Sequence, residues 1–299
     1  MNLTDEQKAM KRQQRKEKIK NRAWEVDALR GLAILLVLWD HFMFDAAFVF
    51  ETTFIDSGNQ ALINFTDFAS SYYYGDLRLY ARPIFIFIFF FVSGICIIFS
   101  RNNIIRGIKL LAVAYTVTLL TYLAEIVFQT TGLFILMGVL HCLGFCILIG
   151  GTIDALLNLI LKDKSYAKWV KFAIYGVLAI VILVINHFYN TTLFQTSDIF
   201  PSHNNDASGF FVFSNNWAGL TNDYFPLLPF LGFFFIGASV AQVLYSKKKS
   251  LFPNVNQKIF APLTVPGRYS LIIYLLAQIV FFFVLGMVSL ALTGTLGFM

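Results

Sequence analysis

The residues of this chain best suited to chemistry lie in one apolar stretch, residues 24–45. In an α-helix of about 100° per residue, Arg30 and His41 fall within about 20° of one face and roughly 16 Å apart along the axis. Asp45 follows His41 by one helical turn. An ionisable side chain inside a membrane span is costly and indicates, by default, a functional site facing a cavity or a partner helix. The stretch therefore predicts a polar face with a cation near one end and an imidazole near its middle.

The predicted chemistry of this face is general acid–base catalysis by His41. A carboxylate that accepts one ring N–H fixes the tautomer and leaves the other nitrogen free as a base, so Asp45 is the expected partner. Two structural interpretations stay open. The His–Asp pair can bond two membrane helices, and Arg30 can anchor the inner end of a span at the headgroups. We favour catalysis, because Arg30 shares the face of His41.

The elements that must position this face are membrane helices. The composition is 58% hydrophobic and 13% charged, with 34 phenylalanines in 299 residues and a mean hydropathy of +0.68. A polytopic membrane protein has this balance, whereas a soluble domain rarely does. The net charge of +6 lies mostly in the N-terminal tail and in short loops beside apolar runs. The positive-inside rule accounts for that distribution, so nucleic acid is not an expected partner.

The sequence predicts an all-α polytopic membrane bundle of about seven transmembrane helices. Residues 1–23 are expected to form a basic cytoplasmic tail and residues 24–299 the transmembrane domain. The expected spans are residues 29–50, 84–100, a third ending near 128, 134–161, 170–188, 225–245 and 269–292. With a cytoplasmic N-terminus, every Lys and Arg falls on the inner side except Arg78 and Arg82. This asymmetry supports the topology, and the expected location is the bacterial cytoplasmic membrane.

Five stretches of the chain carry recognisable motifs. The first is Asp-Ala-Leu-Arg-Gly at residues 27–31, with ten residues between Arg30 and His41. The others are Phe-Val-Ser-Gly-Ile at 91–95, Gly-Val-Leu-His-Cys-Leu-Gly at 138–144, Asp-Tyr-Phe-Pro-Leu-Leu-Pro at 223–229 and Gly-Arg-Tyr-Ser-Leu at 267–271. In this order, the five stretches resemble the catalytic-domain family of heparan-α-glucosaminide N-acetyltransferase, in its bacterial branch among the transmembrane acyltransferases. The chain departs from many bacterial relatives at Ala277-Gln278, where they carry a histidine before the glutamine.

The resemblance implies a transferase that moves an acetyl or other short acyl group from cytoplasmic acyl-CoA. Its acceptor would be an outer-facing glycan or lipid headgroup. His41 would act on the acceptor as a general base or accept the acyl group briefly, with Asp45 beside it. The predicted CoA-binding residues come from the first motif and the first basic loop, where arginine suits phosphate. These residues are Arg30, Asp27, Gly31, Arg101 and Arg106.

Four further residues are candidate substrate contacts: His141, Asp223, Arg78 and Glu125. No metal site is predicted, because His141 and the adjacent Cys142 point about 100° apart on a helix. The resemblance favours substrate or acyl-CoA as the ligand of His141.

Each of the other three candidates also has a structural interpretation. Glu125 belongs to a polar seam with Tyr115, Thr118 and Tyr122, for which bonding between helices is favoured. Arg78 and Arg82 are expected to pair with Asp76 or Glu51 rather than to hold an acidic acceptor. Asp223 is expected to cap the 225–245 span or to belong to the site.

Two other functions stay open. In a transporter or ligand-binding membrane protein, His41, Asp45 and Glu125 would hold a proton or a ligand in mid-membrane. No internal repeat supports this interpretation. In a purely structural subunit, the same residues would only bond helices. The expected partners are membrane lipids, acyl-CoA and the glycan or lipid-headgroup acceptor, and a homodimer is left open.

Overall fold

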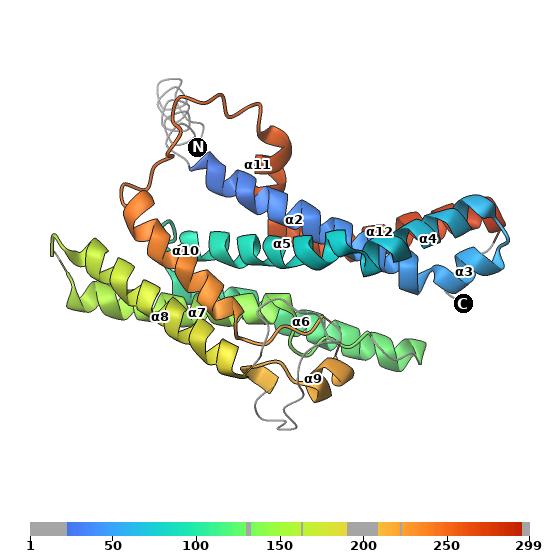
Figure 1. The fold of residues 1–299 in the computed structure, drawn as a ribbon, viewed down its shortest axis with the longest axis horizontal. Coiled ribbons are helices and arrows are strands. Elements are labelled where there is room, and N and C mark those ends of the chain that lie inside the picture. Colours follow the sequence, from blue (N-terminus) through green and yellow to red (C-terminus); the bar gives the residue numbers. More distant parts are fainter. Residues whose placement is uncertain (1–22, 130–132, 163, 190–208, 222, 295–299) are drawn as a thin grey trace, which may run out of the picture. The chain divides into compact units, whose positions relative to one another are not determined.

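The computed structural model describes residues 23–129, 133–162, 164–189, 209–221 and 223–294, and within these ranges the fold is all-α (Figure 1). Among the described residues, six helices are long and apolar enough to cross a membrane. They are α2 (Trp24–Phe44, extended by the π-helix η1, Asp45–Val49), α5 (Asp76–Ile95), α6 (Asn103–Phe128), α7 (Val139–Ile160), α8 (Ala167–Tyr189) and α12 (Ser270–Thr293). The predicted polytopic helical bundle is therefore confirmed. The 1–23 tail lies outside the described residues except for its last residue.

The sixth predicted span, residues 225–245, is shorter than expected. Helix α10 (Phe230–Leu244) has 15 residues, or about 22 Å of helix against a hydrocarbon core of roughly 30 Å. It begins only after Pro226 and Pro229, because proline donates no backbone N–H and cannot continue a helical ladder. The predicted helix over residues 225–229 is thus replaced by a loop, in which the Leu227 N–H donates to the Phe210 carbonyl at 2.9 Å.

The second predicted span begins earlier than expected. Helix α5 starts at Asp76 rather than near residue 84 and includes Arg78, Arg82 and Pro83. Both arginines find a carboxylate partner on α2, so their charges do not exclude this part of the chain from the span. The segment before it folds into α3 (Glu51–Asp56) and α4 (Gln60–Tyr74).

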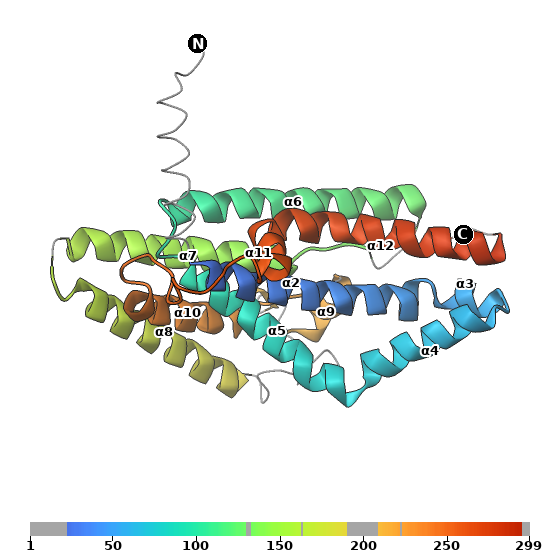
Figure 2. The same ribbon diagram turned by 90° about the horizontal axis from the view of Figure 1, so that it is seen from above.

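The chain divides into two compact units, joined where α5 passes from one to the other. Unit 1 is residues 1–26 and 90–255, and in it α6 packs along α7 while α8 packs along α10 (Figure 2). Unit 2 is residues 27–89 and 256–299, in which η1 contacts α3, α4 and α12. The two short remaining helices are α9 (Asn215–Leu220) in unit 1 and α11 (Ala261–Arg268) in unit 2.

Each unit contains one helix crossing built on a reciprocal pair of glycines. In unit 1, a Cβ on Gly94 would overlap the Phe234 carbonyl, and a Cβ on Gly237 would overlap the Phe91 carbonyl. Small residues let two membrane helices approach until their backbones touch, which strengthens packing where lipid offers no hydrophobic driving force. The α5–α10 contact therefore depends on both positions lacking a side chain.

A single methyl group added at the α5–α10 crossing is expected to lower the stability of the protein strongly. We expect Gly237→Ala to lower the unfolding free energy by about 2 kcal/mol or more, because the new Cβ meets backbone that cannot rotate away. The measurement is thermal unfolding of the purified protein in detergent. Gly219→Ala in α9 is the matched control, since its Cβ would meet nothing within 4 Å. Equal melting temperatures for the two variants would contradict the crossing.

Candidate functional site

His41 and Asp45 face a matching pair of residues on α12 within unit 2. The His41 ring packs edge-on against Tyr274 with centroids 6.0 Å apart. One turn later, both carboxylate oxygens of Asp45 accept from the Gln278 amide nitrogen at 2.9 Å. Residues four apart share a helix face, so α2, with its extension η1, contacts α12 at two successive turns. Asp45 is 1% exposed and opens the π-helix η1, a distortion frequent at functional sites.

The predicted hydrogen bond from His41 to Asp45 is wrong. Among the bonds of the described residues, none joins the two side chains, and the Asp45 carboxylate bonds Gln278 instead. The tautomer of His41 is therefore not set by Asp45. Gln278 was not predicted as a partner from the sequence. An amide side chain in the candidate span of highest mean hydropathy is the feature that could have identified it.

The first motif folds around the buried carboxylate of Asp27, where α2 meets α11. Arg30 lies 3.9 Å from this carboxylate and donates to the Gly267 carbonyl at 3.3 Å. Arg268 donates to the other oxygen of Asp27 at 3.4 Å. Gly31 and Gly267 form the reciprocal glycine crossing of unit 2, and a Cβ on either would overlap backbone of the other helix. Two arginines thus share the carboxylate of Asp27.

Arg78 is held by Asp40, a residue that sequence analysis did not single out. The guanidinium bonds both carboxylate oxygens, with Nε to Oδ1 at 2.6 Å and Nη2 to Oδ2 at 3.1 Å, and lies 3.6 Å from the Tyr73 ring centroid. Arg82 approaches the same carboxylate at 3.5 Å. The predicted pairing of these arginines with Asp76 or Glu51 is wrong, because Asp40 on α2 is their partner.

Tyr72 completes the Asp40 cluster from outside the spans, on α4. Its hydroxyl donates to Asp40 at 3.3 Å. Burial, and then the negative charge of Asp40, raise the pKa of this phenol to about 12, so it remains a donor at neutral pH. An acidic substrate would have to compete with Asp40 for Arg78.

In unit 1, His141 has a partner at each ring nitrogen. The Gly138 N–H donates to Nδ1 at 3.2 Å, so the neutral ring carries its proton on Nε2, which lies 3.0 Å from the Thr118 hydroxyl. The Tyr115 ring packs edge-on against it at 4.9 Å. The polar seam of α6 therefore bonds α6 to α7, as favoured from its spacing, and His141 caps the first turn of α7.

Glu125 and Asp223 join His141 around the segment before α7. Glu125 accepts from the N–H groups of Leu133 and Phe134 at 2.8 and 3.0 Å. Asp223 accepts from the Val139 N–H at 3.3 Å. Asp223 therefore caps α7 and not the predicted 225–245 span. Three of the four predicted substrate contacts lie together here, each with bonds that satisfy backbone donors.

The two predicted arginines of the first basic loop have different roles. Arg106 donates to the Cys96 and Ser93 carbonyls at 3.2 and 3.3 Å, at the end of α5, where a helix leaves carbonyl groups without intrahelical partners. Arg101 is exposed and lines a pocket of about 560 Å³ in unit 1. Among the described residues, no group of three His, Cys, Asp or Glu could hold a metal ion.

Comparison with protein families gives one match, to the model described as heparan-alpha-glucosaminide N-acetyltransferase, catalytic, over residues 22–279. This range includes most of both units. The chain belongs to this family. Comparisons with curated proteins and with solved structures gave no match. Membership of the N-acetyltransferase catalytic family supports an integral membrane protein with an acetyltransferase-like domain.

The family range includes every candidate residue, but the structure groups them differently from the prediction. In unit 2, the first motif gathers Asp27 and Arg30 with Arg268, and His41 faces Tyr274. In unit 1, Glu125, His141 and Asp223 share the start of α7. Sequence reasoning missed four partners, and these are Asp40, Arg268, Tyr274 and Gln278.

The Asp45–Gln278 bond gives a testable stability cycle. We expect Gln278→Leu to lower the unfolding free energy by about 1–3 kcal/mol, because it leaves a buried carboxylate without its donor. Removing both partners, in Asp45→Leu/Gln278→Leu, is expected to cost less than the sum of the single changes. Thermal unfolding in detergent measures all three variants, and strict additivity would show that the two side chains are not coupled.

Replacement of Arg78 by lysine tests the bidentate geometry at Asp40. Lysine keeps the charge but loses the planar fork and the stacking on Tyr73. We expect Arg78→Lys to lower the melting temperature clearly and Arg82→Lys, whose contact is longer, to lower it less. Circular dichroism during heating in detergent gives the comparison, and the reverse order would contradict the assignment of Arg78 as the main partner.

Proposed function

We propose that this chain is a membrane acyltransferase, which moves an acetyl or other short acyl group from cytoplasmic acyl-CoA to an outer-facing glycan or lipid headgroup. The observation that carries the proposal is the geometry of α2. This helix runs without interruption from Trp24 to Phe44, which supports the proposal because Arg30 and His41 then lie within about 20° of one helix face. The family match supports the reaction class. The proposed location is the bacterial cytoplasmic membrane, with the N-terminus inside and a homodimer left open.

His41 is the proposed catalytic residue. As a general base it would take the proton of an acceptor hydroxyl or amine while that oxygen or nitrogen attacks the thioester carbonyl. The carbon–sulfur bond then breaks, a new ester or amide bond forms, and the CoA thiolate takes up the proton. In a two-step reaction, the imidazole itself accepts the acyl group first. Asp45, bonded to Gln278, acts in either case as a positioning residue that fixes α12 and hence Tyr274 against the ring.

The donor's phosphates are proposed to bind at arginines of the first motif and of the first basic loop. Arg30 and Arg268 both approach the carboxylate of Asp27. Arg101 is exposed at a pocket. Arg106 fits the role less well, because three bonds from its guanidinium satisfy oxygens of its own unit. Gly31 contributes by permitting the α2–α11 crossing that places Arg30.

Four side chains are proposed to contact the acceptor: His141, Asp223, Glu125 and Arg78. Each can do so only if the acceptor shares or replaces a hydrogen bond that the side chain makes in this structure. His141 and Arg78 have complete sets of partners, so they serve better as supports than as first contacts. Asp223 and Glu125 are partly exposed. These two are the better candidates for bonds to sugar hydroxyls.

One observation favours transport or ligand binding as a second candidate function. Asp45 is a buried carboxylate in a membrane span whose hydrogen bonds come from a neutral amide, and a proton or a cation would relieve its cost. In that function His41 and Asp45 would relay or bind without covalent chemistry.

The test of the proposed function is transfer from labelled acetyl-CoA by the purified full chain in lipid nanodiscs, with amino sugars and membrane lipids as acceptors. We expect His41→Ala to lower transfer by about 10²–10⁴-fold while CoA still binds, because a general base contributes roughly that factor. His187→Ala is the matched control, a histidine in the last turn of α8. Full transfer by His41→Ala would remove this residue from catalysis, and absent CoA binding would favour transport.

A further inference from the structure

A pocket of about 560 Å³ opens in unit 1 at the side of the basic loops. Its walls come from the turn between α5 and α6, from the second half of α7, and from single residues of α8 and α10. Arg101 belongs to this turn, and the first residues of α6, which follow it, also line the pocket. The positive-inside rule places all these loops on the cytoplasmic side. The pocket is therefore accessible, in this topology, to a ligand arriving from the cytoplasm.

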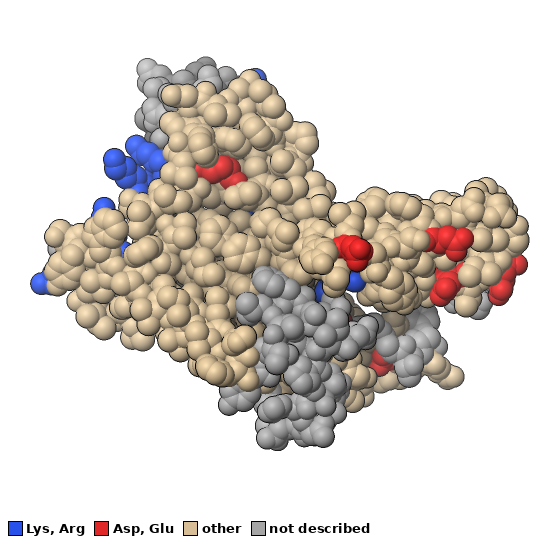
Figure 3. Space-filling view, viewed as in Figure 1, with Lys and Arg blue, Asp and Glu red and all other residues tan. Residues whose placement is uncertain are grey.

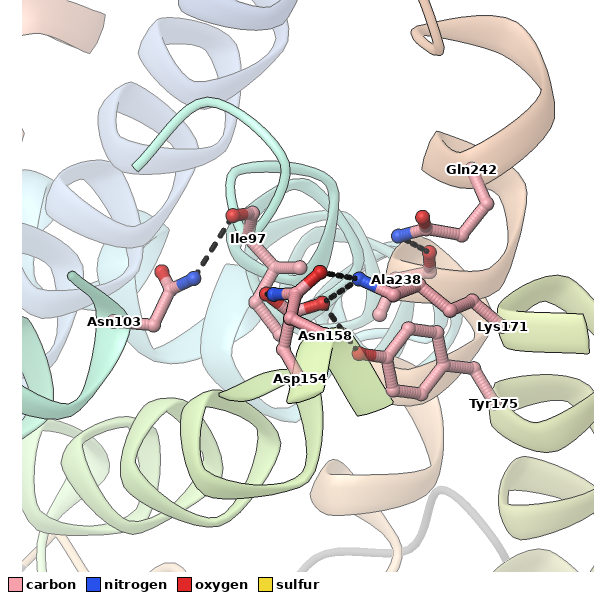
Figure 4. A network of polar contacts seen from close by, with 8 residues as sticks. All are labelled: Ile97, Asn103, Asp154, Asn158, Lys171, Tyr175, Ala238 and Gln242. Atoms are coloured by element: carbon pink, nitrogen blue, oxygen red, sulfur yellow. Dashed lines mark hydrogen bonds and ion pairs between the residues drawn. The ribbon is translucent and has the colours of Figure 1, made fainter. Parts of the chain in front are cut away.

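One wall of the pocket is a closed network of polar bonds (Figure 4). Lys171 donates to Asp154 at 2.7 Å and to Asn158 at 2.6 Å, and Tyr175 donates to Asp154 at 3.0 Å. Asn158 donates back to the second oxygen of Asp154 at 3.0 Å. Lys171 is 9% exposed and Tyr175 is fully buried. The network holds α7 against α8 and neutralises Asp154 within the wall.

The remaining charge of the lining is positive. The acidic group Asp154 is matched by Lys171, so Arg101 and Lys248 leave an excess of two positive charges. Both are exposed, and among the described residues no ion pair joins either of them to a carboxylate. Lys248 has a φ of 53°, in the left-handed region that a lysine seldom adopts. Of the three consecutive lysines 247–249, this is the one that lines the pocket.

The N-terminus of α6 also opens into the pocket. Asn102 caps this 26-residue helix by accepting from the Ile105 N–H at 3.0 Å, and Asn102, Asn103 and Ile104 all line the cavity. The first-turn N–H groups and the dipole of a helix favour an anion at this end. Backbone donors, the planar fork of Arg101 and the point charge of Lys248 thus converge on one space.

We propose that this pocket binds a phosphate group, with Arg101 and Lys248 as its ionic ligands and the Asp154–Lys171 network as its rigid wall. A carboxylate would be matched by one arginine fork, whereas two cations beside a helix N-terminus suit the higher charge of a phosphate. The phosphate can come from the CoA moiety of the donor or from the headgroup of an anionic phospholipid. The first source rests on the proposed function, and the second does not.

The experiment measures two probes on the purified full chain in nanodiscs. CoA binding is followed by calorimetric titration in phosphatidylcholine nanodiscs, and lipid retention by native mass spectrometry after reconstitution with phosphatidylglycerol. We expect Arg101→Ala and Lys248→Ala each to weaken one of the two interactions by about tenfold or more, because bonds to charged groups are worth that factor. Lys249→Ala, which removes the same charge beside the pocket, is expected to change either by less than about threefold.

The outcomes distinguish CoA from phospholipid as the source of the phosphate, and they test the pocket proposal separately from the proposed function. Weaker CoA binding in both pocket variants assigns the site to the donor, whereas loss of retained phosphatidylglycerol with unchanged CoA binding assigns it to lipid. If neither interaction responds more to the pocket variants than to Lys249→Ala, the pocket proposal is overturned, even when acetyl transfer by the wild type stands. If the wild type binds no CoA, the proposed function fails and lipid retention alone decides the pocket.

Discussion

The structure depends on one constraint, which is that a polar group inside a membrane span must find its partner within the protein. The carboxylates in the spans follow it. Asp40 holds Arg78, Asp45 holds Gln278, and Asp154 holds Lys171. Each bond joins two different helices, so satisfying the polar group also fixes a helix contact. The polar residues that first suggest chemistry are therefore also the ones that hold the bundle together.

The family-like motifs combine this bonding with close backbone approach. The first motif supplies both Asp27, which holds Arg268, and Gly31, which admits the backbone of α11. The stretches at residues 91–95 and 267–271 supply Gly94 and Gly267 to the two reciprocal crossings. Gly31, Gly94 and Gly267 thus each mark a helix crossing. Loss of activity on changing such a glycine would not by itself identify a ligand contact.

The sequence could predict the helices but not most of their polar partners. Apolar runs and the distribution of Lys and Arg were enough for the membrane fold, and helical spacing was enough for the seam that meets His141. Partners such as Asp40 with Arg78 lie 38 residues apart, and helical periodicity carries no information on which helices become neighbours. The predicted His41–Asp45 bond failed for the same reason. A local partner at the right spacing was displaced by Gln278, 233 residues away.

The contrast between Arg106 and Arg101 shows how bonding decides which charges are available to a ligand. The two look equivalent in sequence, yet Arg106, in α6, donates to the carbonyl groups at the end of α5, whereas Arg101 precedes α6 and is exposed on the wall of a pocket. A guanidinium bonded to carbonyl oxygens has already replaced its water and gains little by turning to a phosphate. An exposed guanidinium beside a helix N-terminus exchanges only water when it bonds a phosphate, so that bond contributes favourable free energy to ligand binding. Which of these two arginines can bind a ligand therefore depends on the hydrogen bonds that each already makes.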